Sequence, residues 1–215
     1  MVHMAQTSAR PYRGVQPADR RAERRSRLLD AGLTILGSEA GPEALTVRGV
    51  CREAGLSARY FYESFSDRDD FVGAIFEWVI ADLAATTQAA VAAARMADKA
   101  RAGMANIVRS IAGDRRVGRL LFSTKLADPV VVRKRGESGA LLAMLFGQHV
   151  GQALRLPEDD LVRATSHFAV GGVGQTLSAW LGGQISLAPD ELVDQLAWFL
   201  DRLSGQPNRA GQPRA

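Results

Sequence analysis

Residues 46–65 read TVRGVCREAGLSARYFYESF, and this stretch decides the fold of the N-terminal part of the chain. Its first half has apolar residues at i, i+3, i+4 and i+7, which are Val47, Val50, Cys51 and Ala54. This spacing is typical of the buried face of a short helix, and Thr46 is suited to cap its N-terminus. Gly55 suits the left-handed backbone at a helix C-terminus, and Ser57 can cap a second helix that runs from Ala58 to Ser64. The stretch therefore predicts two helices joined by a tight glycine turn.

Two helices with this connection meet steeply over a shared apolar patch. The residues suited to that patch are Val47, Val50, Leu56 and Phe61. The outer face of the second helix then stays free to enter the major groove of DNA. That face carries Ser57, Ala58, Arg59, Tyr60 and Tyr62. The pattern indicates a helix-turn-helix module that binds DNA.

Helical periodicity continues on both sides of this module. A helix is expected from Asp19 until the Gly41-Pro42 pair stops it, and either Ser66 or Asp67 can cap a long helix that reaches about Arg95. Five further helices are expected at about 99–111, 114–125, 128–156, 157–181 and 189–203. No strand pattern competes with them. The sequence predicts an all-α fold of about nine helices, with a three-helix head and a larger helical body.

The 215-residue chain has a formal net charge of +4, and its arginines gather near the N-terminus. Seven of them fall between Arg10 and Arg27, against only Asp19 and Glu23. Residues 1–18 show no periodicity, so we interpret them as a flexible basic arm. Two interpretations of the arginines remain open: they reach an adjacent minor groove, or they form a solvated tail that adds only salt-dependent affinity.

The sequence also excludes several classes of protein. A lone cysteine, Cys51, cannot form an intramolecular disulfide or a cysteine-based metal cluster. No N-terminal apolar run resembles a signal peptide, and no apolar stretch has the roughly 20 residues needed to cross a bilayer. We therefore expect a soluble, cytoplasmic protein with no membrane partner.

The segment from Arg24 to Val72 resembles the DNA-binding head of the TetR family of transcriptional regulators. The fourth helix of that family opens with a Phe-x-x-Lys-like sequence, and Phe65-Ser-Asp-Arg68 stands in its place here. The resemblance implies a repressor that binds a palindromic double-stranded DNA operator as a homodimer and is released by a small, hydrophobic effector. It divides the chain into the arm (1–18), a helix-turn-helix DNA-binding domain (19–66), an effector-binding and dimerisation domain (67–205) and a flexible tail (206–215).

The resemblance assigns DNA contacts to eight positions, which are Thr46, Arg48, Ser57, Ala58, Arg59, Tyr60, Tyr62 and Arg68. The first two are implied to meet phosphates, and residues 57–60 are implied to face base edges. Tyr62 and Arg68 are implied to touch the DNA backbone, with arginine standing where the family usually has lysine. We expect Arg59 to carry the most specificity, because a bidentate contact to guanine discriminates by about 1–3 kcal/mol.

The resemblance also implies an effector cavity between the fourth and eighth helices and a dimer interface on the last two helices. The residues suited to line an apolar cavity are Trp78, Met104, Phe122, Leu141, Met144, Leu145, Phe146, His149, Phe168 and Gln175. The candidates for the dimer interface are Gly171, Gly172, Gly174, Trp180, Leu181, Leu192, Leu196, Phe199, Leu200 and Leu203. Each helical glycine costs about 1 kcal/mol against alanine, so tight packing between subunits would explain the three glycines. Glycines that line the effector cavity are the rival interpretation.

Two other functions are alternatives to a repressor that is regulated by a small molecule. A body that recruits a protein partner and binds no small molecule is compatible with the sequence. An enzyme finds little support, because the chain has no Gly-x-Ser-x-Gly elbow, no His-Glu-x-x-His and no phosphate-binding glycine loop. His149 and His167 lack partners at metal-ligand spacing, so we expect no metal and no cofactor.

Overall fold

The computed structural model describes residues 17–38, 41–154 and 159–204. The N-terminal part contains α1 (Pro17–Leu36), the short 3-10 helix η1 (Gly41–Ala44), α2 (Val47–Ala54) and α3 (Ala58–Tyr62). We call residues 17–66 the head. The described residues form helices and turns but no strand, which confirms the predicted all-α fold with a helix-turn-helix head.

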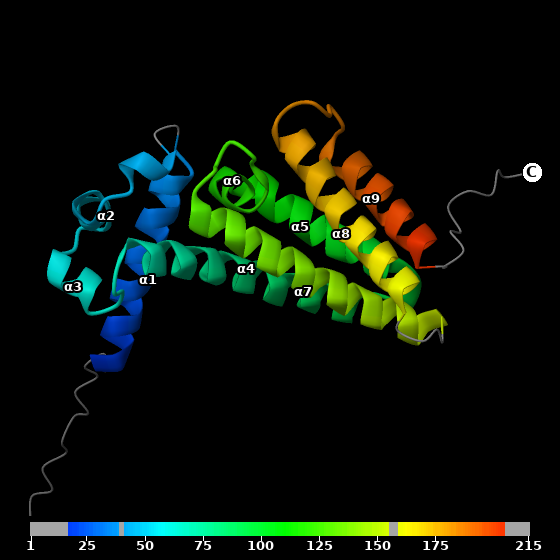
Figure 1. Cartoon of the computed structure of the whole chain (residues 1–215), viewed down its shortest axis with the longest axis horizontal. Coiled ribbons are helices and arrows are strands. Elements are labelled where there is room, and N and C mark those ends of the chain that lie inside the picture. The colour runs from blue at the N-terminus through cyan, green and yellow to red at the C-terminus, as the bar shows by residue number, and fades with distance from the viewer. Residues whose placement is uncertain (1–16, 39–40, 155–158, 205–215) are drawn as a thin grey trace, which may run out of the picture.

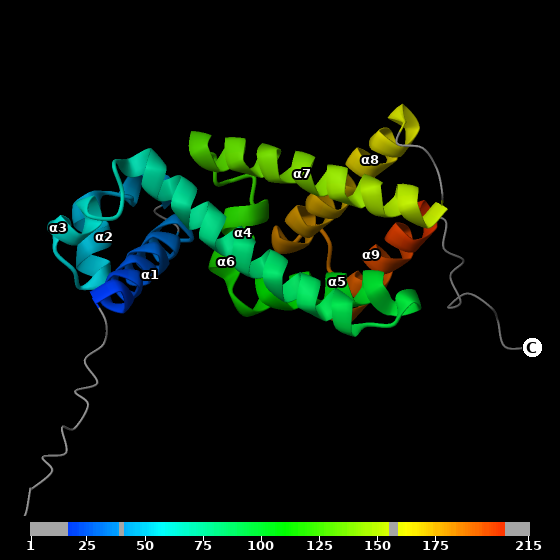
Figure 2. The same ribbon diagram turned by 90° about the horizontal axis from the view of Figure 1, so that it is seen from below.

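The remaining described residues, 67–204, form what we call the body. Its elements are α4 (Arg68–Ala93), the 3-10 helix η2 (Met96–Asp98), α5 (Lys99–Gly113), α6 (Arg115–Phe122), α7 (Pro129–Leu154), α8 (Asp160–Leu181) and α9 (Pro189–Leu203). The head lies at one end of the molecule, and α4 runs out of it along the body (Figure 1). Seen from below, α7 and α4 extend along the body, with α8 and α9 crossing near the end that is remote from the head (Figure 2). The long α4 is therefore the covalent connection between the two parts.

The caps of the head helices follow from local sequence. The Thr46 hydroxyl accepts a hydrogen bond from the Gly49 N–H at 3.1 Å, and Gly55 has a left-handed backbone with φ of 62°. Asp67, and not Ser66, caps α4, because its carboxylate accepts from the Asp70 N–H at 2.8 Å. These three residues fix where α2 begins and ends and where α4 starts.

The recognition helix α3 ends at Tyr62, two residues before the predicted end at Ser64. The N–H groups of Ser64 and Phe65 both donate to the Phe61 carbonyl at 2.9 Å, which closes the helix in a turn. The chain then leads directly into the cap of α4. The turn places Phe65 back in the core of the head.

Three aromatic rings form the centre of the head core. Phe61 lies 5.5 Å from Phe65 and 5.0 Å from Phe71, measured between ring centroids. Helix α1 packs closely on α4 at this level, where a Cβ added at Gly32 would lie 2.5 Å from Ile75 Cδ1 and 2.6 Å from Phe71 Cζ. Glycine at position 32 therefore permits the approach that seals the head against the first turns of α4.

A second cluster of buried residues holds the far end of the body together. It consists of Met104, Val108, Ile111, Leu177, Leu192, Val193 and Leu196, from α5, α8 and α9. Helix α4 belongs mainly to the other cluster, which it shares with the head and with α6 and α7. Of the described helices, α4 alone has the length and composition of a membrane span. Its first part, with the buried residues Phe71, Ile75 and Val79, packs inside this helical core.

Candidate DNA-binding surface

The outer face of α3 presents the residues that the sequence assigns to base reading. Ser57, Ala58 and Arg59 are exposed and Tyr60 is half-buried. Phe61 is only 1% exposed and anchors the inner face of the helix in the core. Ser57 precedes α3 and Ala58 and Arg59 begin it, so these three residues are exposed at the N-terminal end of the helix. Ser57, Ala58 and Arg59 are therefore accessible from outside the head, Tyr60 is partly accessible, and the contact of residues 57–60 with DNA stays a prediction.

Arg59 is available to a DNA base. Its Nε donates to Glu63 Oε1 at 2.8 Å, while the arginine side chain remains 84% exposed. Exposed pairs at this i,i+4 spacing contribute little to stability, because water and salt screen them. Glu63 therefore holds the Arg59 guanidinium only weakly. A guanine base can replace Glu63 as the partner of Arg59 at a small cost in free energy.

The residues assigned to the DNA backbone are also exposed on α2 and α3. Thr46 and Arg48 lie at the N-terminus of α2, and Tyr62 is 63% exposed at the end of α3. The Thr46 oxygen already accepts the Gly49 N–H, but its hydroxyl hydrogen remains to be donated. Thr46 can therefore cap α2 and donate to a phosphate at the same time.

Replacing Thr46 by alanine should lower the free energy of unfolding by about 1 kcal/mol, because the Gly49 N–H loses its acceptor at the start of α2. Urea denaturation followed by circular dichroism measures this change. Thr46→Ser keeps the hydroxyl and serves as the control, with stability close to that of the wild type. Equal stability of Thr46→Ala and the wild type would show that the cap contributes nothing to folding.

Arginines on α1 hold α2 and α3 in place, a role that the sequence interpretation missed. Arg21 Nη2 donates to the Glu63 carbonyl at 2.7 Å, and Arg27 Nη2 donates to the Ala54 carbonyl at 2.6 Å. The guanidinium of Arg24 lies 4.5 Å from the centroid of the Tyr60 ring. These arginines belong to a folded helix, as the predicted helix from position 19 already implied. Arg10 and Arg13 of the proposed arm lie outside the described residues.

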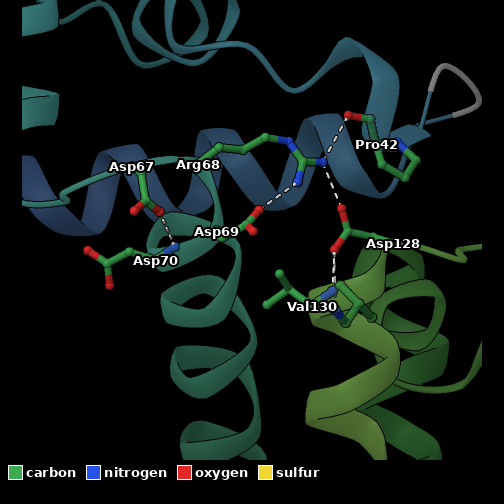
Figure 3. A network of polar contacts seen from close by, with 8 residues as sticks. Pro42, Asp67, Arg68, Asp69, Asp70, Asp128 and Val130 are labelled. Atoms are coloured by element: carbon green, nitrogen blue, oxygen red, sulfur yellow. Dashed lines mark hydrogen bonds and ion pairs between the residues drawn. The ribbon is translucent and has the colours of Figure 1, made fainter.

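Arg68 is placed differently from the phosphate-contacting role that the resemblance implies. Its Nη2 donates to Asp128 Oδ2 at 2.7 Å and to the Pro42 carbonyl at 3.3 Å (Figure 3). Its Nη1 donates to Asp69 Oδ1 at 3.3 Å. The guanidinium thus lies at the junction of head and body. Sixty positions separate Arg68 from Asp128, so no local pattern could reveal this pair.

A cleft of about 900 Å³ opens at the same junction. Its head side includes Leu36 and Pro42, and its body side includes Arg119, Lys125 and Leu126. The lining mixes charged and apolar side chains. This cleft lies outside the space between the fourth and eighth helices, where the resemblance implies the effector cavity. A second pocket, between α7 and α8, holds about 70 Å³, which is too small for a typical small-molecule ligand.

The structure does not gather the ten effector candidates around one cavity. Those with side chains at the surface are Trp78, Leu141, Met144, Leu145, Phe168 and Gln175. Met104 is buried in the cluster of α5, α8 and α9, and Phe122 and Phe146 are half-buried. His149 lies in α7, and its side chain is outside the described residues. The effector role of these residues stays a prediction, because periodicity alone does not distinguish an apolar helix position that faces core or solvent from one that lines a cavity.

Two of the dimer candidates were assigned wrongly. Leu192 and Leu196 are 0% and 1% exposed, because they pack against α5 inside the same chain. The remaining candidates are exposed or half-buried: Gly171, Gly172, Gly174, Trp180, Leu181, Phe199, Leu200 and Leu203. A Cβ added at any of the three glycines would meet nothing within 4 Å. Tight packing within this chain therefore does not explain those glycines.

Comparisons with known proteins agree with this geometry. Residues 28–75 match the family model described as bacterial regulatory proteins, tetR family. The matched segment covers the C-terminal part of α1, all of α2 and α3, and the first turns of α4. No curated protein matches the chain significantly.

Solved structures resemble nearly the whole chain. The fatty acid degradation regulator FadR from Bacillus halodurans has a TM-score of 0.64 at 16% identity, covering 82% of this chain and 94% of that chain. The transcriptional regulator FadR from Bacillus subtilis, solved with stearoyl-CoA, has a TM-score of 0.64 at 16% identity, with coverages of 81% and 96%. A TetR-family regulator from Syntrophomonas wolfei has a TM-score of 0.69 at 12% identity, with coverages of 88% and 99%. These likenesses show a shared fold for head and body.

Proposed function

We propose that this chain is a dimeric repressor of the tetR family that recognises a specific operator, because residues 28–75 match the model of that family of bacterial regulatory proteins. The observation that carries the proposal is the exposed N-terminal end of α3, where Ser57, Ala58 and Arg59 are accessible on a helix that Phe61 anchors in the core. A symmetric dimer presents two such helices, so its operator is a palindrome with half-sites about 34–36 Å apart or a multiple of that distance. The family match indicates a regulator and not an enzyme.

The exposed side of α8, with the neighbouring part of α9, is the proposed dimer face. Leu161, Phe168, Gly171 and Gly172 recur on one side of α8, and the first two are 74% and 71% exposed. Phe199 of α9 is also exposed. Apolar side chains of this size gain stability when a partner covers them, and the glycines leave room for close approach of a second helix. These residues replace Leu192 and Leu196 in the proposed interface.

We further propose that a small molecule with a long apolar part regulates operator binding. The Bacillus subtilis FadR structure contains stearoyl-CoA, which supports testing acyl-CoA esters first. Operator binding is measured by fluorescence anisotropy with acyl-CoA esters of increasing chain length, and free coenzyme A is the control. Release of the operator by the esters alone would support this class of effector. Unchanged operator affinity across the series would rule it out.

Recruitment of a protein partner is the second candidate for the body. It is favoured by Leu141, Met144 and Leu145 of α7, which are about half-exposed. If these residues lie outside the dimer face, their substitution with serine leaves the dimer and operator binding intact. A repression defect in cells that accompanies normal operator binding in vitro would then support a partner.

Arg59→Ala should relax the preference at one base pair of each half-site, because the bidentate contact to guanine is lost. The expected loss of discrimination is about 1–3 kcal/mol, or roughly 5- to 150-fold. In vitro selection from random duplexes yields the operator, and a set of single-base variants then measures the preference. Arg59→Lys keeps the charge without the planar fork and is the matched control for electrostatics. Uniformly weaker binding to every sequence would make Arg59 a phosphate contact instead.

A further inference from the structure

Asp128 lies where the head meets the body. This carboxylate is only 3% exposed, and both of its oxygens have partners. Oδ1 accepts from the N–H groups of Val130 and Val131 at 2.9 and 3.3 Å, which caps α7. Oδ2 accepts from Arg68 at 2.7 Å (Figure 3). The carboxylate is therefore fixed rigidly at the N-terminus of a body helix.

Arg68 connects this fixed carboxylate to the head. It is the first residue of α4, whose next residues include Phe71 of the head core. The same Nη2 that meets Asp128 also meets the Pro42 carbonyl in η1. One guanidinium thus joins the start of α4, the η1 segment of the head and the N-terminus of α7. A buried carboxylate that loses its cation is costly, so this contact resists any change in the angle between head and body.

Other arginines join the two parts through α6. Arg116 Nη1 donates to Thr34 Oγ1 at 2.7 Å and Asp30 Oδ1 at 3.1 Å, and Arg119 Nη1 donates to the Gly37 carbonyl at 2.6 Å. Within the body, Arg135 of α7 donates to the carbonyls of Arg119, Leu120 and Leu126. That contact ties the end of α6 to α7. Helices α6 and α7 are therefore tied into one unit, and this unit contacts the head.

We propose that Arg68 is a positioning residue, which sets the orientation of the head through Asp128 and does not serve as a phosphate contact. The proposal rests on the proposed function, because head orientation matters when two recognition helices must match a fixed half-site spacing. The contact between Arg68 and Asp128 then affects operator affinity, although Asp128 is buried at the junction of head and body. A purely electrostatic effect would have the opposite sign, since removing a negative charge favours binding to DNA.

Asp128→Asn and Arg68→Gln test the proposal in the full-length dimer. Asparagine has nearly the shape of aspartate and can still cap α7, and thermal unfolding checks that both variants fold. Each should lower operator affinity by about tenfold, and the double variant should lose little more, because both remove one contact. The dependence of log affinity on log salt should keep its slope. Asp69→Asn is the matched control: this residue also touches Arg68 but its side chain is 73% exposed, so operator affinity should not fall.

A second readout separates positioning from general destabilisation. The affinities of the wild type and the variants are measured for a series of operators. In this series the spacing between the half-sites increases by one base pair at a time. The variants should show a flatter or shifted spacing preference, whereas a merely destabilised protein would lose affinity equally at all spacings. Wild-type or tighter binding by Asp128→Asn, together with a salt slope reduced by about 1 in Arg68→Gln, would overturn the proposal and make Arg68 a phosphate contact. A wild type without sequence preference would instead overturn the proposed function.

Discussion

Replacing Phe61 by alanine is expected to abolish specific DNA binding by loosening the head. The ring is 1% exposed and contacts two other aromatic rings, Phe65 and Phe71, which together close the core beneath α3. Removing a buried phenylalanine costs about 3–5 kcal/mol, a large part of the roughly 5–15 kcal/mol that stabilises a typical domain. The recognition residues on α3 would then lose the support that aligns them.

Thermal unfolding and operator titration measure this effect together. Phe61→Leu keeps most of the apolar volume and is the control, with an expected loss of less than about 1.5 kcal/mol. It should retain operator binding at temperatures where Phe61→Ala has lost it. If Phe61→Ala melts and binds like the wild type, α3 does not depend on this core.

Replacing Phe168 by aspartate is expected to split the dimer. The side chain lies in the middle of the exposed apolar side of α8, and two-fold symmetry would place the substitution twice in one interface. A central apolar contact is worth about 2 kcal/mol or more in each subunit, so the dimer dissociation constant should rise roughly a thousandfold. Operator affinity should fall with it, because a monomer meets only one half-site.

Sedimentation equilibrium measures the dimer, and fluorescence anisotropy measures the operator complex. Met96→Asp is the matched control, since Met96 is also an exposed apolar residue but lies in η2, away from α8. It should leave both constants unchanged. A Phe168→Asp protein that remains dimeric at micromolar concentration would place the interface on another surface.

The head could be predicted from sequence because its signals are local. Thr46 and Gly55 mark the ends of α2 within one turn of the residues they cap, and Phe61 follows from helical spacing. The register of the recognition face then needs no knowledge of the rest of the chain. The end of α3 at Tyr62, the contacts of Arg21 and Arg27, and the choice of Asp67 as the cap of α4 required the structure.

The body could not be predicted in the same detail, because its assignment depends on which helix covers which face. Helix α9 has apolar residues on two sides: Leu192 and Leu196 meet α5, while Phe199 remains exposed. Periodicity identifies both sets as apolar but does not say which one a partner helix of the same chain already covers. The same limit applies to charged residues. Arg68 pairs with Asp128 only because tertiary packing brings the two together, so the pair could not be predicted from local sequence.

Sequence-specific binding by the head can be measured in a single titration. The full-length protein is bound to the operator obtained by selection and to a scrambled duplex of the same length and composition, at several salt concentrations. We predict a preference for the operator of about a thousandfold or more near physiological salt, with an inverted repeat in the preferred sequence. Equal affinity for the two duplexes, falling in parallel as salt rises, would show binding through charge alone and would contradict the account.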